Sequence, residues 1–456
     1  MMKFDNIVIG FGKGGKTLAA ALAGAGQTVA LVEQSPKMYG GTCINVACIP
    51  TKSLEHSARL SAAQGGDFEE KARRYALAID EKRRLTAMLR QKNYEKAVSA
   101  GVNVIDGKAY FLDENRIAVE KEDGVTQELY GERIFINTGS RPFLPPIEGL
   151  DGNPFVYTSE TLMERETLPR RMVIIGGGYI GLEFASYFNN FGSEVTILQD
   201  GEDFIPREDK EVAQAVLENL ISRGISIWRN ASTSKIREES GGAVLTVETL
   251  DGTKELKADA VLVATGRRPD VRELHPEAAG VELTPRGAVK VDETLRTSVP
   301  HIWAMGDVAG GLQFTYISLD DSRIVKDQLL GKGERTTANR GEVPYTVFLD
   351  PPLSRVGLSE EEARSKGYDV KIARLPAAAV PKAQVLKKPA GLLKAVVDGS
   401  TDRILGAHFF CAESQEMINL VKLAMDGGLT YTVFRDGIFT HPTMSEALND
   451  LFVNVK

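Results

Sequence analysis

The sequence predicts an α/β protein that contains two copies of one strand–helix–strand unit, followed by an α+β domain. A glycine-rich run follows an apolar strand at Gly10 and again at Gly176, and each run leads into a helix and a second strand. From Val343 onwards strands and helices alternate without such a run, which predicts a separate last domain. A chain of 456 residues has room for about three domains.

The parts of the first unit are a strand over residues 4–9, the run GFGKGG, an alanine-rich helix over 17–25 and a strand over 28–32. This order is the Rossmann fingerprint in its full context. Gly10 and Gly12 form the turn and admit a pyrophosphate, and Gly15 lets the helix pack on the strand. Glu33 follows Gly10 by 23 residues, where an acid accepts ribose hydroxyls.

The parts of the second unit are a strand over residues 172–175, the run GGGYIG, a helix through 189 and a strand over 194–198. Gln199 holds the position that Glu33 holds in the first unit. TGRRP at 265–269 repeats TGSRP at 138–142. Two such units suggest two dinucleotides, and a flavin with a nicotinamide is the obvious pair. The alternative is a duplicated fold that binds one nucleotide.

The composition and the net charge argue against some classes of binding partner and some cellular locations. The formal net charge is −7, which argues against a generic nucleic-acid or anionic-membrane surface. The chain starts directly with a strand, and no apolar stretch is long enough for a signal or a transmembrane helix. We therefore expect a cytoplasmic protein without nucleic-acid or membrane partners.

The segment GGTCINVACIPTK, residues 40–52, is the candidate reactive site. Cys43 and Cys48 are separated by four residues, so that their sulfurs can form a disulfide and also separate. A helix is predicted to begin at about Cys48 with Pro50 in its first turn, where the helix dipole stabilises a thiolate. A structural disulfide is the alternative, but such bonds are rare in a reducing compartment. Cys411 lies in the apolar run GAHFFCAE and is expected to be buried.

The remaining elements are predicted from periodicity and from turn residues. The predicted ranges are helices within 68–100, strands over 102–111, 116–120 and 133–137, a strand ending at Gly306-Asp307, a helix after Leu312, strands over 345–349, 369–374, 391–397 and 404–410, and helices over 360–365 and 414–425. An acid at Asp307 suits flavin ribityl hydroxyls. Amides near Phe314 to Tyr316, at the start of a helix, suit an anionic ring oxygen.

The C-terminal run IFTHPTMSEALNDLF contains a candidate acid–base pair. Glu446 follows His441 by five residues and is expected to lie in a helix that Ser445 or its neighbour opens. A carboxylate so close can orient an imidazole and stabilise its protonated form. A satisfied core histidine is the ordinary alternative, but the adjacent Pro442 and the cysteine pair upstream favour catalysis.

Together these motifs resemble the pyridine nucleotide–disulfide oxidoreductases, the family of glutathione reductase, lipoamide dehydrogenase and mercuric reductase. The match runs along essentially the whole chain through GFGKGG, GGTCINVACIPTK, INTGS, GGGYIGLEFA, VATGRRPD, WAMGDVAGG, PPLSRVG and HPTMSE. MYGGTCIN, EFASYFNNFGSEVTIL and GGLQFTYISLDDSRIV resemble the reactive-chlorine-resistance (RclA-type) branch, described as hypothiocyanous acid reductases and as copper(II) reductases.

The resemblance implies a glutathione reductase-like fold, FAD and NAD(P)H as cofactors, and a homodimer whose active site is shared between subunits. It divides the chain into an FAD-binding domain (1–148 and 270–340), an NAD(P)-binding domain (149–269) and a C-terminal α+β dimerisation domain (341–456). The residues it implies for FAD are Gly10, Gly12, Gly15, Glu33, Gly41, Thr42, Lys52, Ala109, Thr138, Gly139, Ser140, Gly306, Asp307, Phe314 and Thr315. Those it implies for the nicotinamide coenzyme are Gly176, Gly178, Tyr179, Gly181, Gln199 and Gly266.

The catalytic residues that the resemblance implies are Cys43, Cys48, Lys52, Glu183, His441 and Glu446. Lys52, one helical turn after Cys48, is expected to approach the flavin and to pair with Glu183; the alternative is a surface lysine. Tyr179 is expected to cover the flavin on its nicotinamide side. His441 and Glu446 are expected to serve the cysteines of the partner subunit.

The sequence departs from the family at several positions. Ala47 stands where glycine is common, which narrows the space beside Cys48. Gln199 replaces the acid that selects NADH, and no arginine pair follows, Arg207 being the nearest. We therefore expect loose coenzyme selectivity. A heavy-metal domain before the first unit and a cysteine pair near the C-terminus are both lacking, which argues against mercuric reductase and large thioredoxin reductases.

The sequence therefore predicts an NAD(P)H-dependent flavoprotein disulfide reductase whose substrate is a small oxidant, with hypothiocyanous acid as the first choice. Cys43 is expected to attack the substrate and Cys48 to face the flavin and resolve the adduct. No metal site is expected. Three alternatives remain: reduction of copper(II), held by two soft thiolates; reduction of a larger disulfide such as glutathione or lipoamide; and a flavin redox sensor without turnover.

Overall fold

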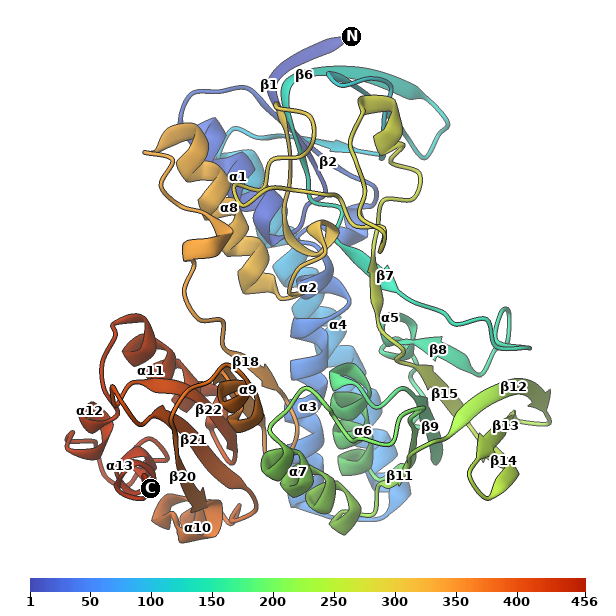
Figure 1. Cartoon of the computed structure of the whole chain (residues 1–456). Helices are drawn as coiled ribbons and strands as arrows, with labels where there is room; N and C mark the ends of the chain where they lie inside the picture. The colour runs from blue at the N-terminus through green and yellow to red at the C-terminus, as the bar shows by residue number, and fades with distance from the viewer.

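The computed structural model describes all residues 1–456 and shows three lobes around two long helices. These helices are α3 (Cys48–Gln64) and α4 (Phe68–Ser99), which run downward from the first lobe in Figure 1. α4 is one continuous helix that starts with a capping box: Asp67 accepts from the amide of Glu70, whose side chain accepts from the amide of Asp67. None of the helices is both long enough and apolar enough to cross a bilayer.

The first lobe is built on a seven-stranded sheet of order β3-β2-β1-β6-β5-β4, with β17 paired to β6. The strands are β1 (Met2–Ile9), β2 (Val29–Glu33), β3 (Asn103–Asp106), β4 (Lys108–Phe111), β5 (Arg116–Glu120), β6 (Thr126–Ile136) and β17 (Ile302–Ala304). β1, β2, β3, β6 and β17 are parallel. α1 (Lys13–Gly24) and α8 (Thr315–Leu330) pack side by side next to the sheet (Figure 1). The carboxyl ends of β1, β2 and β6 meet at the first glycine run, where an open α/β sheet binds its ligand.

The second lobe repeats this plan with a five-stranded parallel sheet of order β11-β10-β9-β15-β8. Its strands are β8 (Val156–Thr158), β9 (Arg171–Ile175), β10 (Glu194–Leu198), β11 (Ser226–Trp228) and β15 (Ala260–Val263). A three-stranded antiparallel sheet of β12 (Ser232–Glu239), β13 (Gly242–Thr249) and β14 (Gly252–Ala258) extends it. The helices are α5 (Ser159–Leu162), α6 (Tyr179–Phe191) and α7 (Lys210–Ser222).

The two TG-x-RP segments lie side by side. β7 (Ser140–Pro142) and β16 (Arg267–Pro269) form a two-stranded antiparallel sheet in which Arg268 is opposite Arg141. The chain leaves the first lobe through β7 and returns through β16. The sequence repeat therefore marks the two crossings between the lobes.

The third lobe is a five-stranded antiparallel sheet of order β18-β19-β22-β21-β20 with helices around it. The strands are β18 (Tyr345–Val347), β19 (Leu353–Gly357), β20 (Val370–Pro376), β21 (Leu392–Asp398) and β22 (Ile404–Phe410). The helices are α9 (Glu360–Ser365), α10 (Pro381–Val385), α11 (Ser414–Asp426), α12 (Thr432–Arg435) and α13 (Ala447–Val453). The sequence analysis missed β19, and Cys411 is buried directly after β22.

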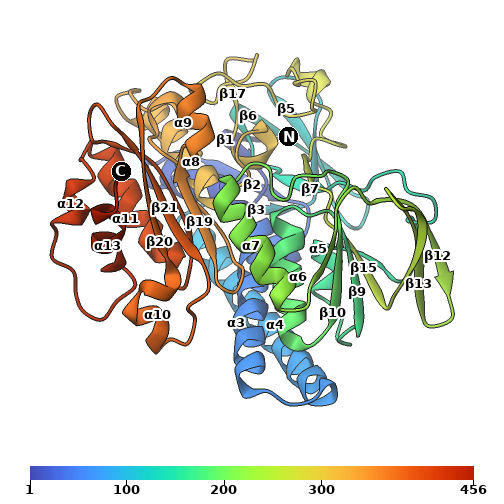
Figure 2. The ribbon, with the colours of Figure 1, turned by 60° about the horizontal axis from the view of Figure 1, so that its bottom comes forward.

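One hydrophobic cluster joins the lobes. It combines buried residues of α3 and α4, such as Leu54 and Tyr75, with Phe184 of α6 and with Leu353 and Phe410 of the third sheet. α7 lies against β21 and β22, and Figure 2 shows it beside the third sheet. The sequence analysis placed α3, α4 and α6 correctly as helices, but their packing on one another comes from tertiary structure.

A buried ion cluster also connects the second and third lobes. Lys394 of β21 is 2% exposed and lies 2.9 Å from Asp209, 2.6 Å from Glu211 and 2.8 Å from Glu360. Because removing one partner of a buried ion group leaves an uncompensated charge, this cluster favours a fixed orientation of the two lobes.

Candidate active site

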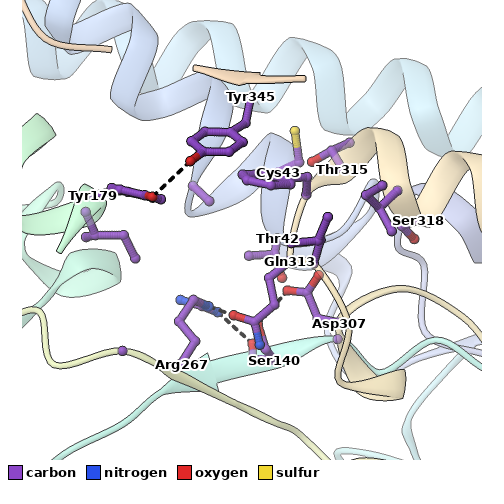
Figure 3. A pocket seen from close by; sticks show the side chains of 18 of the residues that line it. Thr42, Cys43, Ser140, Tyr179, Arg267, Asp307, Gln313, Thr315, Ser318 and Tyr345 are labelled. Carbon is purple, nitrogen blue, oxygen red and sulfur yellow. Dashed lines mark hydrogen bonds between the residues drawn. The ribbon is translucent and has the colours of Figure 1, made fainter. Parts of the chain in front are cut away.

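A cavity of about 3850 Å³ runs between the lobes and contains most of the candidate residues. Both glycine runs, both cysteines and the start of α8 line it. In Figure 3 Cys43 and Thr315 lie together on one side, and Ser140, Arg267 and Asp307 lie together on another. The candidate residues in its lining are Gly10, Gly12, Glu33, Gly41, Thr42, Cys43, Cys48, Lys52, Ala109, Thr138, Gly139, Ser140, Gly176, Gly178, Tyr179, Glu183, Gln199, Gly266, Asp307, Phe314 and Thr315.

The first glycine run is packed so closely that side chains do not fit. A Cβ on Gly10 would lie 2.3 Å from the carbonyl oxygen of Asn137, and one on Gly12 would lie 2.5 Å from its amide oxygen. That amide oxygen accepts a hydrogen bond of 2.8 Å from the backbone of Gly15. α1 begins here without a side-chain cap from Gly12 and without an acid in its first turn. The amides of Gly14 and Gly15 donate to Ser318 and Asn137, so the amide of Lys13 and the positive end of the helix dipole are what an anion such as a pyrophosphate can meet.

Glu33, at the end of β2, faces the same turn. Its carboxylate accepts hydrogen bonds from the backbone of Phe11 at 2.9 Å and of Ser35 at 3.3 Å. Burial raises the pKa of Glu33 to about 7, although these hydrogen bonds oppose the shift. A buried acid with free acceptor capacity at this position suits ribose hydroxyls.

Asp307 forms a second polar contact point farther along the cavity. It lies in a short 3₁₀ turn, Gly306–Ala309, rather than at the end of a strand as expected. Ser140 donates a 2.6 Å hydrogen bond to the Asp307 carboxylate, and Arg267 donates to Ser140 from its Nε at 3.0 Å (Figure 3). Burial raises the pKa of Asp307. Gly306, beneath it, has a φ of 74°, which favours glycine.

The second glycine run reproduces the geometry of the first. A Cβ on Gly176 would lie 2.5 Å from the carbonyl oxygen of Ala264, as Gly10 faces Asn137. A Cβ on Gly181 would lie 2.2 Å from the carbonyl oxygen of Gly176. Gly178 N-caps α6 without a side-chain acceptor and has open space around its Cα. This lobe therefore offers a second place where a phosphate can meet helix amides.

The cysteine pair lies at the joint of α2 (Thr42–Asn45) and α3. Cys48 is the first residue of α3, as predicted, and Ala47 precedes it as N-cap. The hydroxyl of Thr315 lies 3.4 Å from the Cys48 sulfur. The pKa of Cys48 lies below its usual range, mainly because the Cys43 thiol donates a hydrogen bond to its sulfur. The Thr315 hydroxyl and the Lys52 cation lower it further, whereas burial opposes the shift.

Cys43 has the opposite character. Its thiol donates to the Cys48 sulfur, and this hydrogen bond together with burial raises the pKa of Cys43. Both cysteines are free thiols and partly accessible. In the reduced pair Cys48 is therefore the thiolate and Cys43 is the thiol that holds the proton. Cys411 takes no part, because it is fully buried and burial raises the pKa of its thiol.

Lys52 and Glu183 form an ion pair between α3 and α6. The Lys52 Nζ lies 2.9 Å from Glu183 Oε1 and 2.7 Å from Oε2. Glu183 Oε1 also accepts a 2.9 Å hydrogen bond from the backbone of Phe348 in the third lobe, and the Phe348 ring lies 4.6 Å from the Lys52 ammonium. All three lobes therefore contribute to holding Lys52 one turn beyond Cys48.

Tyr179 meets a partner that the sequence analysis did not find. Its hydroxyl donates to the buried carboxylate of Glu208, and the hydroxyl of Tyr345 donates to the same oxygen at 2.6 Å. The rings of Tyr179 and Tyr345 are 5.7 Å apart (Figure 3). The Tyr345 ring also stacks on Phe314 at 5.8 Å. Burial, reinforced by the nearby Glu208 carboxylate, raises the pKa of both tyrosines. This side of the cavity is therefore walled by aromatic rings from three lobes.

His441 and Glu446 lie outside this cavity. The His441 Nδ1 is 2.8 Å from Glu446 Oε2, and the backbone of Thr443 donates to Glu446 Oε1 at 3.2 Å. The His441 side chain is 72% exposed, so it is not a core histidine. It lines a small separate hollow beside α10. Glu446 precedes α13 instead of lying inside it. Within one chain the histidine and the cysteines are not brought together.

Three functional residues escaped the sequence analysis for one physical reason. Asn137, Arg267 and Ser318 hold the cavity through hydrogen bonds to residues more than 100 positions away in the chain. Asn137 and Arg267 belong to the recognised motifs INTGS and VATGRRPD, which was the only available signal. Ser318, whose hydroxyl accepts from the backbone of Gly14 at 3.1 Å, lies in the run GGLQFTYISLDDSRIV, which gave the same kind of signal.

The residues of the cavity fit FAD together with a nicotinamide coenzyme. Two glycine cradles exclude side chains in front of uncapped helix starts, which suits two pyrophosphates. Glu33 and Asp307 supply acceptors for ribose and ribityl hydroxyls in the first lobe. The cysteine pair and both glycine cradles line the same cavity, so the cavity connects the two nucleotide cradles with the cysteines.

Comparison with known proteins agrees with this geometry. Residues 4–322 match the model of the pyridine nucleotide-disulphide oxidoreductase family, and residues 343–452 match its dimerisation domain. The chain is 50% identical to the probable pyridine nucleotide-disulfide oxidoreductase RclA of Escherichia coli over 100% of both chains. It is 33% identical to a mercuric reductase of Staphylococcus aureus over 98% of this chain and 81% of that protein.

Solved structures agree as well. A Cu(II) complex of the HOCl-induced flavoprotein disulfide reductase RclA from Escherichia coli superimposes with a TM-score of 0.94 at 49% identity over 100% of both chains. A second structure, of the HOCl-induced flavoprotein disulfide reductase RclA from Escherichia coli, superimposes with a TM-score of 0.93 at 49% identity, over 99% of this chain and 100% of that one.

Proposed function

Because this chain belongs to the pyridine nucleotide-disulphide oxidoreductase family, whose members use FAD and NAD(P)H, we propose that it reduces a small oxidant, hypothiocyanous acid, at Cys43 and Cys48. It is a flavoprotein disulfide reductase of the same type as its Escherichia coli relative, which is described as HOCl-induced. Hypothiocyanous acid is a small electrophile of the same oxidative context. A small oxidant needs no large recognition surface beside the cysteines.

The observation that carries the proposal is the division of roles within the cysteine pair. Cys48 is the stabilised thiolate at the start of α3, and Cys43 is the thiol beside it on the open cavity. Cys43 is the attacking residue and carries a proton, and Cys48 is the resolving residue and is already charged. Such a pair can form a disulfide after the substrate has reacted.

The dithiol and hypothiocyanous acid balance without another reactant. The Cys43 sulfur attacks the electrophilic sulfur, the S–O bond breaks, and the hydroxide leaves as water with the proton of the Cys43 thiol. The Cys48 thiolate then attacks the Cys43 sulfur, thiocyanate leaves, and the Cys43–Cys48 disulfide forms. FAD, when bound, supplies the electrons of NAD(P)H that reopen this disulfide. Lys52 stabilises the Cys48 thiolate by its charge.

The proposed division of labour follows the lobes. Residues 1–148 and 270–340 bind FAD through Gly10, Gly12, Glu33 and Asp307, and residues 149–269 bind the coenzyme through the second glycine run. Residues 341–456 form the dimer. His441, exposed and paired with Glu446, then reaches the cysteines of the partner subunit, takes the proton of the Cys43 thiol as its sulfur attacks, and passes that proton to the departing hydroxide.

Reduction of copper(II) is a second candidate, favoured by the Cu(II) complexes of the relative. No group of three or more His, Cys, Asp or Glu side chains is arranged to hold a metal ion. The thiols of Cys43 and Cys48 are soft donors that suit copper as a transient substrate. A cysteine-to-serine variant of the relative also forms a Cu(II) complex, so that copper capture there does not require both thiols. A reductase of larger disulfides and a flavin sensor without turnover remain the other candidates.

Steady-state oxidation of NADH and NADPH by the purified FAD-loaded protein tests these functions. Hypothiocyanous acid, oxidised glutathione, lipoamide and Cu(II) are offered in turn. We expect rapid turnover with hypothiocyanous acid and none with the two disulfides. Turnover with Cu(II) alone would establish the second candidate, and no turnover with any oxidant would favour the sensor.

A further inference from the structure

We propose that Gln199 makes this protein select NADH over NADPH, because the side chain presents only its carbonyl oxygen to the coenzyme ribose. The inference rests on the proposed placement of the coenzyme on the second glycine run. It replaces the loose selectivity expected from the sequence with a definite preference.

The orientation of the Gln199 amide is fixed by its neighbours. Its nitrogen lies 3.1 Å from the carbonyl oxygen of Gly201 and 2.6 Å from that of Asp203. A carbonyl oxygen accepts hydrogen bonds only, so the amide atom facing these two must be the nitrogen. Both of its protons are used, and none is left for a ligand.

The amide oxygen consequently points the other way, toward the glycine turn. A Cβ on Gly177 would lie 2.4 Å from Gln199 Oε1. Gln199 directly follows β10. Gly177 lies just after β9, the strand that pairs with β10 in the sheet. This is the carboxyl edge of the sheet, where the adenosine ribose of a dinucleotide lies in a Rossmann unit. No protein donor is bonded to Oε1, which is therefore free to accept from a 2′-hydroxyl.

The charges around this position oppose a 2′-phosphate. Asp200, Glu202 and Asp203 are exposed, and none has a salt-bridge partner. Two cations also line the cavity, Arg207 and Lys210, of which Lys210 is paired with Glu361 at 2.7 Å. Arg229 donates to the carbonyl oxygen of Glu202 at 3.2 Å. A phosphate of NADPH carries roughly two negative charges and requires donors, whereas the Gln199 acceptor and the carboxylates of Asp200 and Asp203 line the cavity here. A 2′-hydroxyl is a donor and matches Oε1.

Equilibrium binding of NAD⁺ and NADP⁺ to the oxidised FAD-loaded protein, measured by calorimetry, tests the inference without turnover. We expect NAD⁺ to bind at least about tenfold more tightly, because the site offers an acceptor to one coenzyme and repulsion to the other. Gln199→Ala should weaken NAD⁺ binding severalfold, whereas NADP⁺ binding should not weaken, because the acceptor that opposes its phosphate is gone. NADP⁺ binding as tight as NAD⁺, or NAD⁺ binding unaffected by Gln199→Ala, would overturn it.

Two further variants separate this inference from the proposed function. Asp200→Arg should tighten NADP⁺ binding by about tenfold through a new phosphate contact, while Asp151→Arg, an exposed charge reversal outside the cavity lining, should not. No gain from Asp200→Arg speaks against the location of the 2′ position. Gly178→Ala should weaken both coenzymes equally, because the pyrophosphate approaches this backbone. If Gly178→Ala weakens the binding of neither NAD⁺ nor NADP⁺, the coenzyme does not bind at the second glycine run. The coenzyme site in the proposed function is then wrong.

Discussion

The Lys52 ammonium lies 2.7 Å from the Glu183 carboxylate, and this ion pair joins the helix that starts at Cys48 to the helix that starts at the second glycine run. The pair is partly buried, with side chains 31% and 15% exposed. The two charges act on the Cys48 thiolate with opposite signs, Lys52 lowering its pKa and Glu183 raising it. The pair therefore tunes the reactive sulfur as well as packing two lobes together.

Replacing either half of this pair should shift the pKa of Cys48 in opposite directions. Lys52→Met removes a cation that stabilises the thiolate, so the pKa rises toward the ordinary cysteine range of about 8.5. Glu183→Gln removes an anion, so the pKa falls further. Ultraviolet titration of the thiolate in the reduced protein measures both, with Lys37→Met, an exposed lysine, as control. Shifts in the same direction would indicate a structural role only.

Changing Cys43 separates its chemistry from its hydrogen bond. Cys43→Ser and Cys43→Ala should both abolish turnover while FAD remains bound, because the attacking sulfur is lost. Serine keeps a donor for the Cys48 thiolate and alanine does not. The pKa of Cys48 should therefore be higher in the alanine variant than in the serine variant, by the same titration. Reductase activity in either variant would contradict the proposed mechanism.

FAD affinity should depend on pH through Glu33. Burial raises the pKa of Glu33 to about 7 in the ligand-free protein, whereas ribose hydroxyls donate to its ionised form and lower that pKa on binding. Affinity is therefore complete above pH 7 and declines as the pH falls below 7. Reconstitution of FAD-free protein, followed by flavin fluorescence between about pH 8 and pH 6, measures this. Glu33→Gln should bind more weakly and without the pH dependence.

Mixed dimers test whether His441 serves the other subunit. Neither Cys43→Ser nor His441→Ala homodimers should turn over at the wild-type rate. If the site is shared, a mixed dimer of the two variants contains one intact site, and an equal mixture recovers about a quarter of wild-type activity. If each subunit uses its own histidine, mixing restores nothing. Glu446→Gln should lower the rate, because the His441 imidazole loses the carboxylate that orients it at 2.8 Å.

Removing the Tyr345 hydroxyl should destabilise the protein. The Glu208 carboxylate is 5% exposed, accepts from Tyr345 and Tyr179, and has a second oxygen without a partner. Tyr345→Phe should therefore reduce the free energy of unfolding by about 1.5–3 kcal/mol, the range for a hydrogen bond to a charged group. Chemical denaturation measures it. Tyr368→Phe, a partly exposed tyrosine of the same lobe without a hydrogen-bond partner, should change little.

Local patterns were sufficient for the two Rossmann units and for the helix at Cys48, because glycine turns, apolar strands and helix starts are decided by neighbours in the chain. The same reasoning set the start of α1 four residues late, at Thr17 instead of Lys13, since two glycines stand in its first turn. It also expected Asp307 at a strand end, whereas a 3₁₀ turn carries it.

The sequence by itself determined the family, the cofactors, the two glycine cradles and the reactive cysteine pair, since each depends on a short run of residues with one chemical role. Only the tertiary structure decided how these runs meet. Tyr345 and Glu208 are 137 positions apart, and the direction of the Gln199 amide depends on two backbone carbonyls that a loop turns toward it. Such hydrogen bonds form only when distant parts of the chain fold against one another, so a local sequence pattern does not predict them.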